Sequence, residues 1–143
     1  MDDEELLDAL AKLYEKASIE SYGIDIINIG ELTIKEVDDF NTHIGKNLKG
    51  FKKIIKFNSA RHIVKTHGKS YETLNSQKQI ESEHFSNIPN IIKNYNSIEF
   101  QPKDHKKGKY QDCILLTKDN YSVVLEIIYG NKELTLKTMW LNK

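Results

Sequence analysis

Residues 59–68 read S-A-R-H-I-V-K-T-H-G, and the rest of the chain can be interpreted from this stretch. Ser59 is a good N-cap and Gly68 stands where a short helix needs a left-handed stop, so the spacing predicts one helix between them. At 3.6 residues per turn, one face of this helix is largely apolar and the other is cationic. The two faces are Ala60, Ile63, Val64 and His67, and Arg61, His62 and Lys65. A titratable imidazole between two fixed cations can act on a phosphodiester, although a solvated cationic face is the more common reason for such a pattern.

The composition indicates a single soluble domain. The chain has 143 residues and a formal net charge of zero, which is enough length to bury a hydrophobic core. Its one cysteine, Cys113, leaves no disulfide framework and no cysteine-based zinc site, and we expect it in the core of a strand. No apolar run is long enough to span a bilayer, and the first residues, M-D-D-E-E, differ from the basic start of a signal peptide. We therefore expect a protein of a reducing compartment, the cytoplasm, with no membrane contact.

The neutral total hides an asymmetry along the chain. Residues 1–45 hold three lysines and twelve acidic residues, a net charge of −9, so residues 46–143 carry +9. A basic body suits binding to nucleic-acid phosphates. We therefore divide the chain into an acidic helical N-terminal extension, 1–45, and a basic domain, 46–143. The extension could cover the basic body, dock a partner or be part of a longer linker, and packing of its helix on the domain is favoured because an amphipathic helix needs burial.

Helices come first along the chain and strands last, which predicts an α+β fold. Before residue 59 we expect an amphipathic helix over 3–17, a strand or extended connector over 24–29, a helix from the Thr33–Glu36 capping box to Ile44 with a stop at Gly45, and a lysine-rich extended segment over 46–56. After residue 68 we expect a loop over 69–83, a short helix capped by Ser86 or Asn87 with Pro89 in its first turn, a strand from 97, a basic loop over 103–109, and an antiparallel meander over 113–117, 121–129 and 133–140.

The order of these features resembles a known nuclease family. The segments that carry the resemblance are L-K-G-F-K-K-I-I-K-F-N-S-A-R-H-I-V-K-T-H-G (48–68), I-P-N-I-I-K-N (88–94), S-V-V-L-E-I-I (122–128) and L-T-L-K-T-M-W (134–140). They are similar to phage-associated nuclease domains of the barnase, EndoU, colicin and RelE-like superfamily, most of which are inferred ribonucleases. The resemblance implies a helix packed on a four-stranded antiparallel sheet, an active site on the concave side of the sheet, and no metal or other cofactor.

The family pattern falls on eight residues of this chain. They are Arg61, His62, Lys65 and His67 in the helix, Glu126 in the penultimate strand, and Lys137, Thr138 and Trp140 in the last strand. The closing T-M-W is also similar to the hydroxyl-x-Trp of the colicin D type nuclease. The resemblance implies a metal-independent endoribonuclease, such as a phage or mobile-element effector or a toxin. Its partner would be RNA, either tRNA or mRNA, and an inhibitor or immunity protein is a further partner to test for.

The residue types suit RNA cleavage without a metal, because the 2′-hydroxyl of RNA is its own nucleophile. The enzyme must take the proton of that hydroxyl, protonate the leaving 5′-oxygen and stabilise charge on phosphorus. His62 is the expected general base or acid, since an imidazole titrates near pH ~6.5. Arg61 and Lys65 would hold the phosphate, and Thr138 would donate a hydrogen bond. The residues expected to bind substrate are Lys53, Lys137, Trp140 and Tyr121, the two aromatic rings by stacking on a base.

Two of these assignments have structural alternatives. His67 shares a face with apolar residues and precedes Gly68. A structural role, as a buried imidazole bonded to the carbonyls at the helix end, is therefore as well supported as a catalytic one. Trp140 and Tyr121 suit core or edge positions as well as stacking.

The position of Glu126 depends on the turn at residues 129–132. A turn of two or four residues places Glu126 beside Thr135 or Lys137, away from Thr138, whereas a three-residue bulged turn brings Glu126 and Thr138 to one face. Pairing of Glu126 with a lysine across the strands is the structural alternative to a catalytic role.

Two other functions stay open. A binding or protein-interaction module of the same fold would bind RNA without turnover, and it would have no activity to lose. A metal-dependent nuclease is disfavoured, because the carboxylates gather in residues 1–45 and not around the basic helix.

Overall fold

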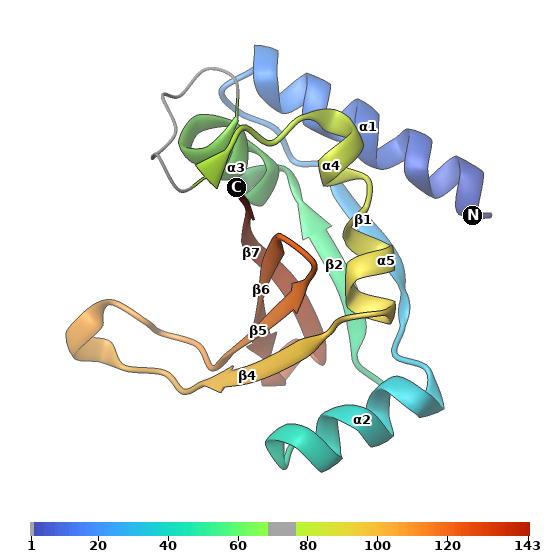
Figure 1. The fold of residues 1–143 in the computed structure, drawn as a ribbon, viewed down its shortest axis with the longest axis vertical. Helices are drawn as coiled ribbons and strands as arrows, with labels where there is room; N and C mark the ends of the chain where they lie inside the picture. Colours follow the sequence, from blue (N-terminus) through green and yellow to red (C-terminus); the bar gives the residue numbers. More distant parts are fainter. Residues whose placement is uncertain (1, 69–76) are drawn as a thin grey trace.

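The computed structural model describes residues 2–68 and 77–143, and in this part of the chain seven strands form one sheet with helices packed on it (Figure 1). The helices are α1 (Asp3–Ile19), α2 (Ile34–Ile44), α3 (Phe57–His67), α4 (Ser82–Phe85) and α5 (Ile88–Lys93). The strands are β1 (Ile26–Glu31), β2 (Lys52–Lys56), β3 (Gln77–Lys78), β4 (Ser97–Gln101), β5 (Cys113–Lys118), β6 (Tyr121–Ile128) and β7 (Glu133–Asn142). Short 3-10 turns lie at His105–Lys107 and Tyr129–Asn131.

The α+β class is confirmed, but the prediction of four antiparallel strands is wrong. The sheet order is β1-β2-β7-β6-β5-β4, with β3 paired to the end of β7. The meander β4 to β7 is antiparallel, whereas β2 lies parallel to β7 and brings β1 with it. Parallel strands need a long crossover connection, so this pairing joins residues far apart in the sequence and no short-range pattern reveals it.

The N-terminal elements follow the predicted pattern. Helix α1 buries Leu10, Leu13, Tyr14 and Ala17, and the Thr33–Glu36 capping box of α2 is present. The helix ends at Gly45 with the left-handed φ of 69° that a glycine stop needs. Residues of α1 and α2 belong to the same hydrophobic core as those of β6 and β7. The division at residue 45 is therefore a division of charge along a chain that shares one core.

The start of α3 differs from the prediction. The helix begins at Phe57, directly after β2, and its N-cap is Lys56, which makes no side-chain cap hydrogen bond. Ser59 does not cap the helix. Its hydroxyl donates to the backbone oxygen of Leu136 in β7, so the first turn of α3 is tied to the last strand of the sheet.

The end of α3 also differs from the prediction. Gly68 has φ −98° and ψ −169°, an extended conformation and not a left-handed stop. A glycine is needed there for space, since a Cβ would lie 2.6 Å from the Val64 oxygen and 2.8 Å from the Tyr14 hydroxyl. Tyr14 donates this hydroxyl to the oxygen of Ile80, and the Ile80 amide donates to the oxygen of His67 at 2.6 Å. These contacts fix the last residue of α3.

The chain between α3 and β4 was predicted as a loop followed by one helix. Residues 69–76 of that loop lie outside the described residues. Residues 77–78 form β3 and the short helix α4 begins at Ser82, so the loop prediction is wrong there. The predicted helix is α5, with Pro89 in its first turn. The expected side-chain cap from Ser86 or Asn87 is absent: α5 has Asn87 at its N-cap without a side-chain hydrogen bond.

Side chains alternate between two faces of the sheet. The face under the helices carries the core, including Val123, Leu125 and Ile127 of β6 and Leu134, Leu136, Met139 and Leu141 of β7. On the other face, which we call the open face, lie Cys113 of β5, Glu126 of β6, and Thr135, Thr138 and Trp140 of β7. None of these five residues belongs to the main hydrophobic cluster under the helices, although Cys113 and Thr135 are buried. No helix in the described residues is long and apolar enough to cross a lipid bilayer.

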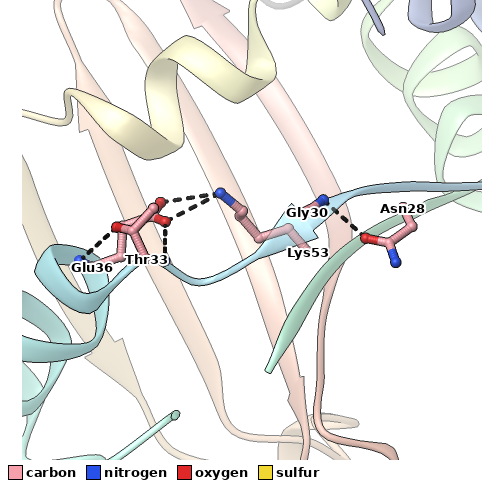
Figure 2. Close-up of polar contacts among 5 residues, drawn as sticks. All are labelled: Asn28, Gly30, Thr33, Glu36 and Lys53. Atoms are coloured by element: carbon pink, nitrogen blue, oxygen red, sulfur yellow. Dashed lines mark hydrogen bonds and ion pairs between the residues drawn. The ribbon is translucent and has the colours of Figure 1, made fainter. Parts of the chain in front are cut away.

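A buried ion pair connects α2 to β2 on the helical side (Figure 2). The ammonium of Lys53 lies 3.2 and 3.3 Å from the two carboxylate oxygens of Glu36, and the two side chains are 14% and 8% exposed. Glu36 also accepts the backbone N–H of Thr33 at 2.9 Å. The pair therefore fixes α2 against the sheet, and Lys53 points away from the open face.

We expect Lys53→Met to lower the free energy of unfolding by about 3 kcal/mol, because it leaves a buried carboxylate without its cation. Urea denaturation followed by circular dichroism measures this loss. The double variant Glu36→Gln/Lys53→Met should recover most of it, since no buried charge remains. The control Lys35→Met breaks the exposed Lys35–Asp39 pair and should leave stability unchanged. A double variant as unstable as the single one would contradict the prediction.

Candidate active site

Four polar or aromatic side chains meet where α3 lies against the C-terminal half of β7. The rings of His62 and His67 are 6.2 Å apart between centroids, and the ring of Trp140 lies 6.3 Å from His67. Lys137 is close enough to His62 for its charge to affect the titration of that imidazole. These four residues form the candidate site, and all of them were among the residues predicted from the sequence.

The surroundings of His62 favour its neutral form. His62 is an exposed residue, but neighbouring atoms partly desolvate its ring, and the positive charges of His67 and Lys137 repel the imidazolium, so the pKa of His62 lies below its ordinary value. A neutral imidazole with a free lone pair can accept a proton near neutral pH. The lowered pKa of His62 therefore favours the protonation state that a general base requires.

His67 is oriented by a neighbour on β3. Its Nδ1 lies 3.0 Å from the side-chain oxygen of Gln77. Because an amide oxygen only accepts, Nδ1 donates the hydrogen bond and Nε2 is left as the atom that faces other groups. The backbone bond from Ile80 holds the same residue from the other side. His67 is therefore a fixed imidazole and not a freely rotating one.

A β-bulge in the last hairpin brings Glu126 and Thr138 to one face. Four residues separate β6 from β7, and Glu126 pairs with Thr135, as expected for a turn of that length. The register then shifts between Val124 and Leu125, so that Val124 pairs with Thr138. Because Val124 and Glu126 are two residues apart on β6, Thr138 lies on the face of Glu126. The bulge within the strands therefore brings Glu126 and Thr138 to one face, the result that was expected from a three-residue turn.

Buried polar groups lie on this face beside Lys137. The hydroxyls of Thr135 and Thr138 are buried and have no hydrogen-bond partner among the described residues. Burial raises the pKa of the neighbouring Cys113 thiol, which also lies within the electrostatic range of Lys137 and Glu126. Leaving such hydroxyls unpaired costs free energy, about 1–3 kcal/mol for each group. A ligand that supplies oxygen atoms here would recover part of this cost.

Four other predicted site residues lie away from this group. Arg61 donates from Nη1 to the backbone oxygen of Ala17 at 2.7 Å, so its guanidinium ties α3 to α1. Lys65 is exposed on the outer side of α3. Tyr121 packs against the core, and its ring centroid lies 6.2 Å from that of His84. Lys53 is bound to Glu36 on the helical side, as described above.

The comparison with protein families gives a single assignment. Residues 28–143 match the family described as phage-Barnase-EndoU-ColicinE5/D-RelE like nuclease3. The chain belongs to this nuclease family. Searches of curated proteins and of solved structures found no match. The family acts on nucleic acid, and the match includes most of β1 and all of α2 as well as the segments that carry the resemblance.

Three features of this nuclease do not follow from the local sequence. Gln77 lies in a segment predicted as a loop, and its contact with His67 has no short-range signal. Thr135 is predicted only as a neighbour of Glu126 and not as part of the site. On β2, the alternation of side chains turns Lys53 toward the helices and its neighbours Lys52 and Lys56 toward the open face. The alternation of side chains along residues 54–56 decides which lysines face the helices and which face the open side. Because Ile54 and Ile55 are both apolar, the sequence alone does not show which of the two faces the core.

Among the described residues, no group of three or more His, Cys, Asp or Glu side chains is arranged to hold a metal ion.

We expect the imidazole of His62 to titrate below the ordinary histidine value of about 6.5 and its pKa to rise in Lys137→Met. The sign follows from charge, because removal of a nearby cation stabilises the imidazolium. NMR titration of the histidine Cε1 protons measures both values. Lys12→Met, which changes an exposed lysine on α1, should leave the titration of His62 unchanged. An unchanged pKa in Lys137→Met would show that the two side chains do not interact.

Proposed function

We propose that this nuclease is a metal-independent endoribonuclease that cuts RNA by attack of the 2′-hydroxyl on the adjacent phosphodiester. The observation that carries the proposal is the pair of imidazoles 6.2 Å apart, with the Lys137 ammonium near His62. Two proton-transfer groups at this separation can contact the attacking and the leaving oxygen of one phosphodiester, and a nearby cation suits the charge that develops on phosphorus.

In this mechanism His62 acts as the general base and His67 as the general acid. His62 takes the 2′-hydroxyl proton, the 2′-oxygen forms a bond to phosphorus, and the bond from phosphorus to the 5′-oxygen breaks. His67 gives a proton to that 5′-oxygen. The products are a 2′,3′-cyclic phosphate and a 5′-hydroxyl, so atoms and charge balance without a metal ion. The lowered pKa of His62 supports its assignment as the base.

The remaining residues bind or position the substrate. Lys137 stabilises the dianionic phosphorane, and the hydroxyl of Thr138 donates to a non-bridging oxygen. Trp140 stacks on a base next to the cut. Glu126 orients Lys137 from the neighbouring strand, and Lys65 meets a flanking phosphate at the outer side of α3. Arg61 is a positioning residue in this scheme, because its guanidinium holds α3 on α1.

A protein that cuts cellular RNA in this way suits the role of a toxin or of a phage or mobile-element effector. Its RNA target would be tRNA or mRNA, and a producing cell would need an inhibitor protein. The rival function, an RNA-binding module without turnover, predicts salt-sensitive RNA binding that survives the loss of His62.

We expect the purified protein to cleave total RNA in excess EDTA and to leave ends with 2′,3′-cyclic phosphate. His62→Ala should reduce the rate about 10²–10⁴-fold, the usual contribution of a positioned acid or base. Electrophoresis and mass spectrometry of the fragments measure rate and end groups, and circular dichroism confirms that the variant is folded.

A substrate with a single 2′-deoxynucleotide at the cleavage site is the matched control, because it binds normally and lacks only the nucleophile. Cleavage of that substrate, or activity that requires magnesium, would contradict the mechanism. RNA binding without cleavage by the wild type would favour the rival function.

We expect Gln77→Leu to lower kcat about ten-fold or more with little change in KM, because His67 loses its orientation and not its contact with substrate. Gln77→Glu keeps an acceptor oxygen at the same place and should restore most of the activity. Steady-state kinetics on a fluorogenic dinucleotide measure both. A loss that the glutamate variant does not restore, or one that appears only in KM, would argue against a positioning role.

A further inference from the structure

The loop between β4 and β5 is a basic arm that extends beyond the rest of the sheet (Figure 1, light orange). We define the arm as residues 102–112. It carries four lysines and one histidine against two acids: Lys103, Lys106, Lys107, Lys109, His105, Asp104 and Asp112. None of the four ammonium groups forms an ion pair with a described residue. The arm therefore carries a net charge of +2 with His105 neutral.

Both carboxylates of the arm are used to shape it. Asp104 accepts the Lys106 N–H and pairs with Lys109 through two backbone hydrogen bonds of 2.9 Å. At the base, Asp112 accepts the Lys103 N–H and the hydroxyl of Tyr129, each at 2.8 Å. The acids thus hold the backbone in a defined hairpin while the lysine side chains stay free for a partner.

The arm also exposes an aromatic surface. Tyr110 is 70% exposed, and its ring centroid lies 5.5 Å from that of His105. An exposed ring offers a flat surface, and bases of single-stranded nucleic acid stack readily on such rings. Lysines that meet phosphates and rings that meet bases are the usual combination in single-strand binding.

The base of the arm is connected to the candidate site across the open face. Gln101 pairs with Cys113, Cys113 with Glu126, and Glu126 with Thr135. Neighbouring strands are about 4.8 Å apart, so the base of the arm lies about 10 Å from β7 along this row. An RNA strand cut beside Lys137 therefore reaches the arm with its neighbouring nucleotides if it crosses the open face.

We propose that the β4–β5 arm binds the RNA strand that flanks the scissile phosphodiester, so that the preferred substrate is single-stranded RNA several nucleotides long. This inference rests on the proposed function for the identity of the bound strand. The lysines of the arm contact phosphates, and Tyr110 with His105 stacks on a base. The catalytic residues then act on any dinucleotide, while the arm selects for length.

The test compares a dinucleotide with a twelve-nucleotide single-stranded RNA as substrates for the wild type, Lys106→Gln/Lys107→Gln and Tyr110→Ala. Both variants should keep the wild-type kcat/KM on the dinucleotide. On the longer RNA, Tyr110→Ala should lose about five-fold or more, the lower end of one stacking interaction. For the lysine double variant, the slope of log Kd against log salt should be smaller by about 1.4, corresponding to two phosphate contacts on a single strand.

Lys12→Gln/Lys35→Gln is the matched control, because it removes the same charge from exposed positions on α1 and α2. Equal activity of the arm variants and this control on the longer RNA would overturn the proposal. An arm that binds an acidic protein instead of RNA would give this result. Fluorescence anisotropy with the same RNA measures binding without cleavage, so it tests the role of the arm separately from the nuclease mechanism. If the wild type binds the RNA through the arm but cuts neither substrate, the nuclease mechanism fails and the role of the arm stands.

Discussion

The parallel pairing of β2 with β7 is the contact on which the rest of the structure depends. It joins the β1–β2 hairpin to the C-terminal meander through Lys52–Glu133, Lys53–Leu134 and Ile54–Thr135. Since α3 begins at the residue after β2, the same pairing sets where the helix lies on β7. The bond from Ser59 to Leu136 then fixes its first turn one residue before Lys137. The distance between the imidazoles and the lysine therefore follows from how two strands pair and not from a flexible loop.

The bulge in β7 brings further polar side chains to the candidate site. In a regular hairpin the strict alternation of side chains would put Thr138 and Trp140 under the helices with the core. The extra residue at Leu136–Thr138 reverses the alternation for the second half of the strand, so that Thr135, Thr138 and Trp140 share the open face. Met139 and Leu141 stay in the core for the same reason. One inserted residue thus satisfies both the packing of the core and the gathering of polar groups opposite it.

Local patterns in the sequence were sufficient for the elements whose signals are local. The helical stripe of α1, the capping box of α2 and the meander of the last strands follow from residue spacing, and the motif around His62 and the closing K-T-M-W led to the family. Pairings between distant segments were not predictable in this way. The pairing of β2 and β3 with β7, the contact of Gln77 with His67 and the helical-side position of Lys53 each depend on a partner far away in the sequence. Ser59 and Gly68 are residue types that commonly cap helices, but here they have other roles. Ser59 bonds to β7, and Gly68 leaves space for the Tyr14 hydroxyl and the Val64 oxygen.

Charge explains why the two imidazoles lie in the basic half of the chain. Next to a carboxylate a histidine holds its proton more tightly, whereas beside Lys137 and a second imidazole His62 gives up its proton more readily. In the proposed mechanism the general base must be neutral before it acts, so cation-rich surroundings would favour its active form while the same cations attract the phosphate. The imidazolium formed in that mechanism would be repelled, but the extra negative charge on phosphorus would arise in the same step and offset this repulsion. A cluster of like charges that would destabilise an empty site is thus suited to an anionic transition state.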